Sequence, residues 1–282
     1  MNGPDLPGYE TLRSGPRLWR VRPGLAAALA GSPAAALLEG EPPAPGPPGA
    51  GRAGTMTLVL AGRPAYAKRG VHGGLARRLL GGVFWRDRRG RGVIEAADRL
   101  RAAGVPTPDV LAAGWRTITG PLAAYVLVTE AVPGGASLLA LLGEQPLPRR
   151  RRRLARAAGR SVRALHDAGF VHPDLNLANL VAAHGGEPGA PGGATRVFVI
   201  DLDGGGFRDR VGGSARRGNL KRLLRSYEKW IAPSSPLDPR DALAFLRAYS
   251  GTDRELFRTL VRGLRGGRVR FRWRRRLWRR AR

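Results

Sequence analysis

The chain has 282 residues, of which 43% are hydrophobic, so it is long enough and apolar enough to bury a sizeable core. This composition excludes a wholly disordered chain. There is no cysteine, which excludes a disulfide scaffold, a cysteine-ligated zinc site and a thiol nucleophile. The chain carries 49 Lys and Arg against 21 Asp and Glu, a formal net charge of +28, which indicates a polyanionic partner.

Half of this positive charge lies in two short runs. Arg268–Arg282 contains nine arginines and no acid, and Arg149–Arg153 is five arginines in succession. The chain has only three lysines, Lys68, Lys221 and Lys229. A bias of this kind can follow nucleotide composition, so we give a single lysine more weight than a single arginine.

No apolar stretch near the start suggests a membrane span. The longest one, Gly24–Leu38, is interrupted by Gly31 and Pro33 and falls short of the ~20 residues that a spanning helix needs. The opening residues, MNGPDLPGYE, lack the basic and then apolar order of a secretory signal. Together with the lack of cysteine, this predicts a cytoplasmic protein.

The first half of the chain predicts a small sheet and one helix. Residues 41–54, rich in Pro and Gly, separate a weakly patterned N-terminal segment from the rest. Two β-type runs around Ala61-Gly62-Arg63 predict a hairpin over 55–69. A helix is predicted over Val93–Ala103, with its end at Gly104, and a buried strand over 122–129.

The second half is predicted to be mainly helical. Apolar residues recur at helical spacing over 154–165, 220–231 and 256–264, and we interpret each of these faces as core. Between the first two helices, residues 180–183 and 197–200 form short apolar runs joined by a segment rich in Gly and Pro. This pattern predicts a hairpin with polar residues at its base.

The polar residues beside this hairpin occur in an order that suits phosphoryl transfer. The segment 172–179 holds Asp174 and Asn179 five positions apart, and Asp201 follows the second apolar run. Transfer from ATP requires a carboxylate that orients the attacking hydroxyl and accepts its proton, and oxygen ligands for Mg²⁺. Asp174 is therefore the candidate catalytic residue, and Asn179 and Asp201 are the candidate metal ligands.

A structural interpretation of the same residues must be weighed beside this one. Loops rich in Asp and Asn are often plain turns, because these side chains bond to the local backbone. Any one of the residues alone would carry little functional weight. The ordered combination of helix, polar loop, hairpin and final acid is much more specific, and it favours catalysis.

The segments HPDLNLAN (172–179) and IDLD (200–203) resemble the kinase-like fold and, more closely, the Kdo (3-deoxy-D-manno-octulosonic acid) kinases of the lipopolysaccharide kinase family. The family's catalytic segment reads HxDLNxxN followed by IDFD. Three further stretches share the resemblance: AYAKRGVHGGLARRLLGG, RAAGVPTPDVLAAG and GNLKRLLRSYEKW. It implies an α+β protein-kinase-like fold of two lobes. The N-lobe is a small, mainly antiparallel sheet and the C-lobe is mostly helical.

The resemblance also implies roles outside the polar loop. Lys68, at the end of the early hairpin, would contact the α- and β-phosphates of ATP, and Glu95 on the next helix would hold it in an ion pair. Glu130 matches the segment between the lobes, where the backbone binds adenine. Gly51 and Gly54 would form a glycine-rich loop over the phosphates, and a plain linker fits these two glycines equally well.

Three residues of the catalytic segments have other implied roles. His172 is expected to stabilise the loop by hydrogen bonding. Asn176 takes the place of the lysine that protein kinases carry beside the γ-phosphate. Asn176 and Asp203 are candidates for contact with the substrate or with a second metal ion.

Two features depart from the pattern of the family and of protein kinases. Leu202 replaces the usual Phe, and the glycines at 204–206 make the following loop looser. Only 17 residues separate Asp201 from Asn219, where the next helix is expected to begin. This length is too short to cradle an extended peptide, so we expect a small or lipid-linked acceptor and no protein substrate.

The C-terminal run interleaves arginines with Phe271, Trp273, Leu277 and Trp278, which suits an anchor on an anionic membrane. Arginine-rich tails also bind nucleic acid, and composition bias alone can produce one. We favour the membrane over nucleic acid, because the implied acceptor, a Kdo-bearing lipid A precursor, is polyanionic and lies on the inner leaflet. The run at 149–153 is interpreted as a solvated helix face.

The sequence thus predicts a kinase that uses ATP and Mg²⁺ to phosphorylate a hydroxyl of Kdo, O-4 by resemblance, as a peripheral protein on the cytoplasmic face of the inner membrane. The expected parts are a partly flexible N-terminal extension (1–50), an N-lobe (51–132), a C-lobe (133–265) and a basic aromatic tail (266–282). A core heptose or a small molecule is the alternative acceptor. A catalytically inactive membrane- or nucleic-acid-binding module is the alternative class.

Overall fold

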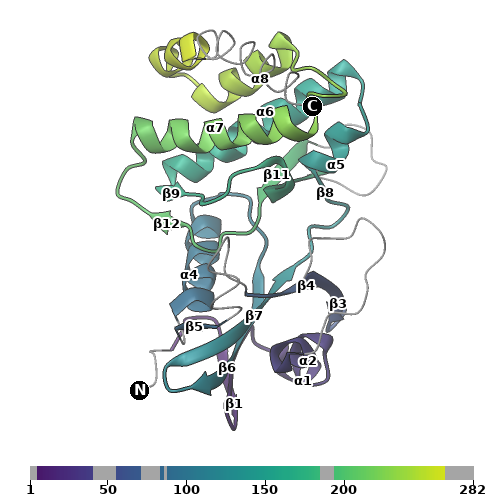
Figure 1. Cartoon of the computed structure of the whole chain (residues 1–282), viewed down its shortest axis with the longest axis vertical. Helices are drawn as coiled ribbons and strands as arrows, with labels where there is room; N and C mark the ends of the chain where they lie inside the picture. Colours follow the sequence, from purple (N-terminus) through teal and green to yellow (C-terminus); the bar gives the residue numbers. More distant parts are fainter. Residues whose placement is uncertain (1–4, 41–54, 71–82, 86–87, 185–193, 264–282) are drawn as a thin grey trace, which may run out of the picture. The chain divides into compact units, whose positions relative to one another are not determined.

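The computed structural model in Figure 1 describes residues 5–40, 55–70, 83–85, 88–184 and 194–263. The chain divides into two compact units. The first unit comprises Met1–Gly135 and Ile200–Phe207, and the second comprises Ala136–Val199 and Arg208–Arg282. Within the described residues, no helix is both long and apolar enough to cross a membrane.

The first unit is built on a seven-stranded sheet in which each strand pair is antiparallel. The strand order along the sheet is β1-β2-β6-β7-β4-β3, and β5 also pairs with β7. The strands are β1 (Glu10–Ser14), β2 (Arg17–Val21), β3 (Thr55–Leu60), β4 (Arg63–Arg69), β5 (Phe84–Trp85), β6 (Val110–Thr119) and β7 (Leu122–Glu130); the short β12 (Gly206–Phe207) also lies in this unit.

The predicted early hairpin is confirmed as β3 and β4. Its turn contains Ala61 and Gly62 at φ of 48° and 78°, and Leu60 pairs with Arg63 across it. Two consecutive positive φ angles give a turn whose twist matches that of the flanking strands. This tight register brings Lys68 to the end of β4, opposite Leu127 of the central strand β7.

The segment before residue 41 belongs to the same sheet and core. β2 pairs with β6, and the helices α1 (Ala26–Ala30) and α2 (Pro33–Glu39) follow it, with α2 packed on the sheet. From its sequence, this segment is expected to belong to an extension over residues 1–50. Its alternation is weak because it is short and broken by turns, and its place in the sheet depends on pairing with a strand almost a hundred residues away.

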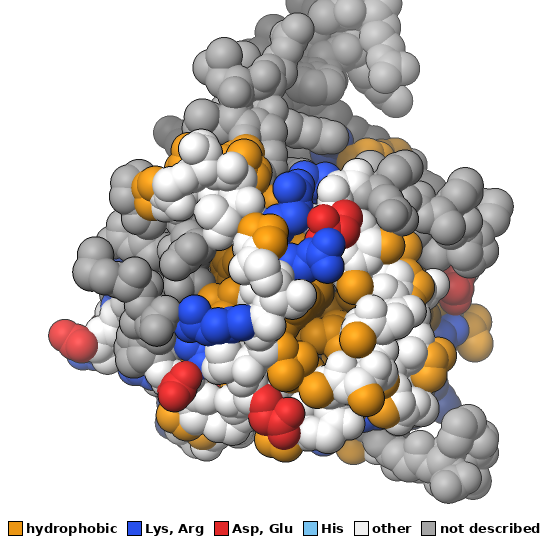
Figure 2. Space-filling model, turned by 90° about the horizontal axis from the view of Figure 1, so that it is seen from below, with side chains coloured by type: hydrophobic (Ala, Val, Ile, Leu, Met, Phe, Trp, Pro, Cys, Tyr) orange, Lys and Arg blue, Asp and Glu red, His pale blue; other side chains and the backbone are white. Residues whose placement is uncertain are grey.

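Charged side chains of the first unit are largely paired with one another. Asp109 is buried and accepts a hydrogen bond from Arg22 Nη2 at 2.7 Å; Arg101 also contacts it, and Arg63 Nη2 lies 3.7 Å from its other oxygen. Figure 2 shows one face of the molecule on which acidic and basic side chains lie beside each other and hydrophobic side chains gather in the middle. Pairing of this kind offsets the cost of burying the carboxylate.

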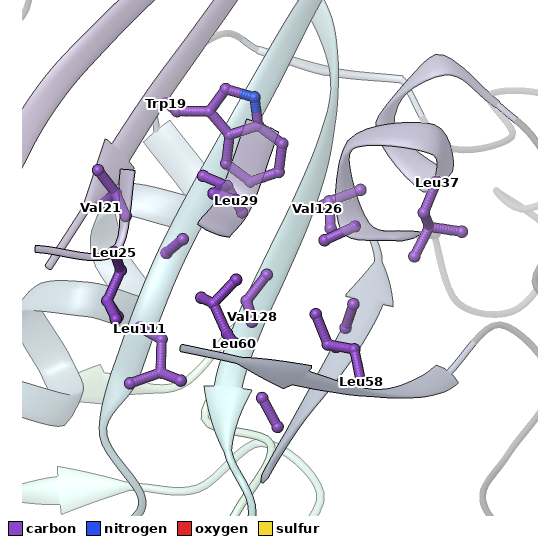
Figure 3. Close-up of a cluster of buried hydrophobic side chains, with 14 of the residues drawn as sticks. Trp19, Val21, Leu25, Leu29, Leu37, Leu58, Leu60, Leu111, Val126 and Val128 are labelled. Carbon is purple, nitrogen blue, oxygen red and sulfur yellow. The ribbon is translucent and has the colours of Figure 1, made fainter. Parts of the chain in front are cut away.

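The core of the first unit lies between the sheet and the N-terminal helices (Figure 3). Alternate residues of the strands, such as Leu58 and Leu60 of β3 and Val126 and Val128 of β7, point to this core. Gly114 of β6 is required here, because a Cβ at that position would lie 2.6 Å from the ring of Trp19. The other labelled members of the cluster are Val21, Leu25, Leu29, Leu37 and Leu111.

The predicted helix of the first unit is α4 (Arg88–Ala102), which begins five residues earlier than expected. It is followed by Gly104 at φ of 75°, as expected of a glycine that ends a helix. Strand β6 was not predicted, because its Ala- and Gly-rich start has a weak intrinsic preference for strands. Pairing with β2 and β7 on its two sides supplies the stability that the local sequence lacks.

The second unit is mainly helical, as predicted. Its helices are α5 (Leu138–Gly143), α6 (Pro148–Asp167), α7 (Gly213–Trp230) and α8 (Pro239–Ser250), and residues 254–263 are also helical. Its strands are β8 (Ala136–Ser137), β9 (Phe170–Val171), β10 (Leu180–His184) and β11 (Thr195–Val199); η1 (Leu177–Asn179) is a 3₁₀ turn. Helix α8 was not predicted, and α7 begins six residues before Asn219, where it was expected.

The predicted second hairpin is confirmed as β10 and β11, with Leu180 paired to Val199. Asn179 directly precedes the hairpin in the chain, and Ile200 and Asp201 directly follow it. The hairpin also pairs with β8 to form a three-stranded sheet in the order β11-β10-β8. The polar residues of interest therefore flank one regular element.

Helices α6 and α8 pack closely at a glycine. A Cβ on Gly159 of α6 would lie 2.5 Å from the carbonyl oxygen of Phe245 and 3.1 Å from the amide nitrogen of Tyr249. Further along α6, Arg163 Nη1 donates hydrogen bonds to the carbonyl oxygens of Tyr249 and Ser250 at 3.1 and 2.9 Å. The two helices therefore run side by side in the same direction, and the absence of a side chain at Gly159 sets how close they come.

We expect Gly159→Ala to lower the free energy of unfolding by about 1–3 kcal/mol, because backbone atoms of α8 cannot yield to the added methyl group. The matched control is Gly218→Ala on α7, where no described atom lies within 4 Å of the added Cβ. This change should raise stability by about 0.5–1 kcal/mol. Urea unfolding of both variants measures the difference, and equal stabilities would contradict the close α6–α8 contact.

Candidate active site

Asp174 lies on an exposed loop between two buried residues, His172 and Leu175. The backbone amide of Asp174 donates to Nδ1 of His172 at 3.1 Å, and its Oδ2 accepts a hydrogen bond from Nδ2 of Asn176 at 2.8 Å. The buried neighbours hold the loop while the carboxylate faces solvent. This arrangement gives an oriented carboxylate that an incoming hydroxyl can reach.

Asn176 was predicted as a candidate contact to substrate or metal, and the structure shows a different use of its side chain. Its Oδ1 accepts hydrogen bonds from the amides of Ala178 and Asn179 at 2.9 and 3.1 Å, while its Nδ2 donates to Asp174. Asn176 thus caps η1 and orients the carboxylate. The predicted contact of Asn176 with substrate or metal stays a prediction.

Asn179 is buried, and its Nδ2 donates a hydrogen bond to the carbonyl oxygen of Asp174 at 2.8 Å. This contact fixes the amide so that Oδ1 is the atom left for a ligand. The amide oxygen is a hard donor of the type that Mg²⁺ takes. In the second unit, the structure therefore brings together Asp174, Asn176 and Asn179.

The loop is supported from behind by a buried polar network that the sequence analysis did not identify. Nδ2 of Asn219 donates to the carbonyl oxygen of His172 at 2.7 Å, and the amide of His172 donates to Oδ1 of Asn219 at 3.2 Å. Nε2 of His166 donates to the same oxygen at 3.0 Å, and its Nδ1 accepts from the hydroxyl of Tyr249 at 2.8 Å. The expected structural role of His172 agrees with this network. One signal was available, since Asn219 is a polar residue on the buried stripe of α7, one turn before Leu223.

Asp201 directly follows β11 and has a left-handed backbone, with φ of 61°. This conformation is uncommon for a residue with a side chain, and such residues cluster at functional sites. Its Oδ1 accepts a hydrogen bond from Nζ of Lys68 at 2.8 Å. The first unit therefore brings together the predicted phosphate-binding lysine and a predicted metal ligand.

The ion pair predicted between Lys68 and Glu95 does not form in this structure. Lys68 pairs with Asp201, while the exposed carboxylate of Glu95 lies 2.8 Å from Nε of Arg91, one turn earlier on α4. The helix register explains this pairing, because residues four apart on a helix are neighbours on its surface. Sequence alone could not rank a local arginine against a distant lysine.

Asp203 was a candidate for a second metal ion or for a substrate hydroxyl, and the structure engages both of its oxygens within the protein. Oδ2 accepts a hydrogen bond from the hydroxyl of Tyr125 at 2.6 Å, and Nε of Arg89 lies 3.0 Å from Oδ1. Burial and the charge of Asp203 raise the pKa of Tyr125, so the phenol stays protonated and remains a donor. Asp203 thus connects the segment after Asp201 to β7 and α4.

Glu130 ends β7, and its side chain has a structural role. Its Oε1 accepts hydrogen bonds from Nε and Nη2 of Arg63 at 3.1 and 3.0 Å, and its backbone amide donates to the carbonyl oxygen of Asp109 at 2.9 Å. Adenine binding by the backbone of this segment stays a prediction. Gly51 and Gly54 lie outside the described residues.

Magnesium binding by Asn179 and Asp201 stays a prediction, and their side-chain oxygens are of the type that Mg²⁺ takes. Among the described residues there is no group of three or more His, Cys, Asp and Glu side chains that could hold a metal. The proposed ligands are one amide oxygen, of Asn179, and one carboxylate, of Asp201. A sparse oxygen set is usual for Mg²⁺, which keeps several waters and takes further ligands from phosphates.

The buried side chain of His166 makes the free energy of unfolding depend on pH. Burial lowers the pKa of His166 from 6.5 to about 4. Below pH 6.5 the unfolded chain therefore binds a proton that the folded chain does not, and the free energy of unfolding falls by up to about 3 kcal/mol down to pH 4. At higher pH both states are neutral and the full stability is present. Urea unfolding across this range should show the loss, and His166→Gln should flatten it; an unchanged slope in the variant would contradict the assignment.

Several known proteins are similar to this chain. The profile of the lipopolysaccharide kinase (Kdo/WaaP) family matches residues 52–249. A 3-deoxy-D-manno-octulosonic acid kinase of Vibrio cholerae serotype O1 is 30% identical over 184 residues, which cover 65% of this chain and 72% of that protein. A protein of the same name from Vibrio parahaemolyticus serotype O3:K6 is 28% identical over 184 residues, covering 64% and 71%.

A solved structure of WaaP in complex with acyl carrier protein is also similar, with a TM-score of 0.57 and 27% sequence identity. The match covers 86% of this chain and 91% of that one. The family match spans well over half of the chain and includes both the polar loop and Asp201. The chain therefore belongs to the lipopolysaccharide kinase (Kdo/WaaP) family and is a phosphotransferase with a two-lobed, protein-kinase-like α+β fold.

Proposed function

We propose that this protein transfers the γ-phosphoryl group of ATP to a hydroxyl of Kdo, the 4-hydroxyl, on a Kdo-bearing lipid A precursor. The observation that carries the chemistry is the exposed carboxylate of Asp174. Its Oδ2 accepts a hydrogen bond from Asn176, and the backbone amide of Asp174 donates to His172. The support for the acceptor comes from the relatives, which are named Kdo kinases and share about 30% identity with this chain.

In this proposal Asp174 is the catalytic base. One of its oxygens is held by Asn176, which leaves the other to orient the acceptor hydroxyl and accept its proton as the oxygen attacks the γ-phosphorus. The bond between the γ-phosphorus and the bridging oxygen of ADP then breaks. Most of the rate comes from positioning and from stabilisation of charge, since phosphoryl transfer needs little covalent chemistry from the protein.

The remaining site residues are assigned to ATP and Mg²⁺. We assign Lys68 to the α- and β-phosphates, and Asn179 Oδ1 and Asp201 to the metal, which when bound neutralises charge on the phosphates. Lys68 and Asp201 already lie 2.8 Å apart in the first unit. This contact keeps the lysine and the carboxylate oriented toward each other.

The chain between Asp201 and α7 supports an acceptor that is not a peptide. Because α7 begins at Gly213, only residues 202–212 are available, which is fewer than the sequence analysis expected. Part of this stretch is tied down, since Asp203 contacts Tyr125 and the amide of Arg208 donates to the carbonyl oxygen of Gly169 at 2.8 Å. A sugar on a lipid requires no extended groove of this kind. We further propose that the enzyme acts at the cytoplasmic face of the inner membrane, with the tail at 266–282, which lies outside the described residues, as one anchor.

We expect Asp174→Asn to lower kcat by about 10²–10⁴-fold, because the amide cannot accept the proton of the hydroxyl. The Asn retains an oxygen that can accept the bond from Asn176, so the fold and the affinity for ATP should change little. Phosphotransfer from labelled ATP and ATP binding are measured side by side. Glu255→Gln is the matched control, since it removes one exposed carboxylate from another part of the same unit. Normal turnover in Asp174→Asn would refute the assigned base.

The acceptor is tested separately by mass spectrometry after incubation with ATP and Mg²⁺. Kdo-lipid A precursor should gain one phosphoryl group on Kdo, and a core bearing heptose or a soluble sugar should not. Transfer to heptose alone would refute the Kdo assignment while leaving the enzyme a kinase. Transfer to no acceptor, with no ATP consumed, would instead favour a catalytically inactive binding module.

Tyr125→Phe tests whether Asp203 positions the metal-binding segment. Loss of the 2.6 Å hydrogen bond leaves Oδ2 of Asp203 without its donor, a change that costs about 1–3 kcal/mol for a buried group. We expect the Mg²⁺ concentration for half-maximal phosphotransfer to rise severalfold. The control Tyr66→Phe removes an exposed hydroxyl from β4. A variant that loses stability but keeps the wild-type Mg²⁺ dependence would show that the contact is merely structural.

A further inference from the structure

A groove lined by five arginines runs between α6 and α8 in the second unit. Arg152, Arg156 and Arg160 line it from α6, and Arg240 and Arg247 line it from α8. The groove encloses about 620 Å³. Its remaining lining residues are Leu243, Ala244 and Ala248, so the walls are cationic, the remaining lining is aliphatic and none of the lining residues is acidic.

The arginines of the groove differ in pairing from Arg151 and Arg163 of the same helix. On α6, Nε of Arg151 lies 2.8 Å from the carboxylate of Asp241, and Arg163 pairs with Asp167. By contrast, none of the five guanidinium groups in the groove has an ion pair or side-chain hydrogen bond within the described part of the chain. Asp241 of α8 thus pairs with Arg151, which does not line the groove, and the arginines of the groove keep their full positive charge. Of the run at 149–153, predicted as a solvated helix face, only Arg152 lines the groove.

The spacing of the charges is regular. Arg152, Arg156 and Arg160 are four residues apart, so they follow one another along α6 at intervals of about 6 Å. Arg152 lies near the start of α6, and Arg240 lies in the first turn of α8, which runs in the same direction. Both helix dipoles thus place their positive ends beside these two arginines, which makes the groove still more favourable for anions.

We propose that this α6–α8 arginine groove docks the protein on anionic membranes by binding the phosphate groups of lipids. Guanidinium groups match phosphate oxygens with paired hydrogen bonds, and each basic residue near an anionic membrane adds attraction. The aliphatic lining suits a lipid headgroup. Aromatic side chains, on which single-stranded nucleic acid stacks its bases, do not line the groove. The proposal rests on the proposed function only in that a lipid-linked acceptor brings the enzyme to a membrane.

The test is flotation of the full chain with vesicles of phosphatidylcholine and phosphatidylglycerol in about a three-to-one ratio. The variant Arg156→Gln/Arg160→Gln/Arg247→Gln should bind these vesicles at least about tenfold more weakly than the wild type. The matched control Arg222→Gln/Arg225→Gln/Arg258→Gln removes the same charge from exposed positions on α7 and on the helix at 254–263, and should lose about twofold or less. The wild type, the groove variant and the control should all fail to bind vesicles of phosphatidylcholine alone.

Three outcomes would overturn the proposal. In the first, the groove variant and the control lose vesicle binding equally. In the second, the groove variant binds vesicles as the wild type does. In the third, the groove variant keeps vesicle binding and instead loses binding to a single-stranded oligonucleotide, which is measured in parallel. Thermal unfolding shows whether each variant is folded. Vesicle binding is measured without ATP, and phosphotransfer to a detergent-dispersed acceptor is measured apart from it. A failure of docking is therefore distinct from a failure of the proposed kinase activity, which the groove variant should retain.

Discussion

The loop that carries Asp174 depends on one buried side-chain amide, that of Asn219. Asn219 holds the backbone of His172 from both sides, through the carbonyl oxygen and the amide nitrogen. His166 donates to the same Asn219 and is held in turn by Tyr249. Because these groups are buried, each lost hydrogen bond would leave a polar atom without a partner, which is costly. The exposed carboxylate of Asp174 can therefore keep its orientation although it faces solvent.

The two units differ in how their arginines are paired with carboxylates. In the first unit, a single buried carboxylate, Asp109, gathers several arginines, and the strands and helix that carry them are held together. In the second unit, Asp241 pairs with Arg151 and leaves the arginines of the α6–α8 groove unpaired. The net charge of +28 is thus not spread evenly, and the proposed contact with an anionic membrane would stabilise the unpaired cations of the groove.

Several predicted site residues prove to position others. Asn176 orients Asp174, Asp203 joins Tyr125 and Arg89, and Glu130 receives Arg63. The sequence did not predict these partners, because a side chain's nearest partner depends on distances that sequence spacing does not contain. Glu95 shows this most clearly, since Arg91 on its own helix is a nearer partner than Lys68.

The sequence by itself determined the polar loop, the two hairpins, most of the helices of the second unit and the family. These features follow from local patterns, such as the turn at Ala61-Gly62 and the spacing of Asp174 and Asn179. Only the tertiary structure decided the pairing of β2 with β6, the contact of Lys68 with Asp201 and the network around Asn219. Each of these contacts joins residues far apart in the chain. Such contacts depend on burial and packing in the folded protein, which a local sequence pattern does not predict.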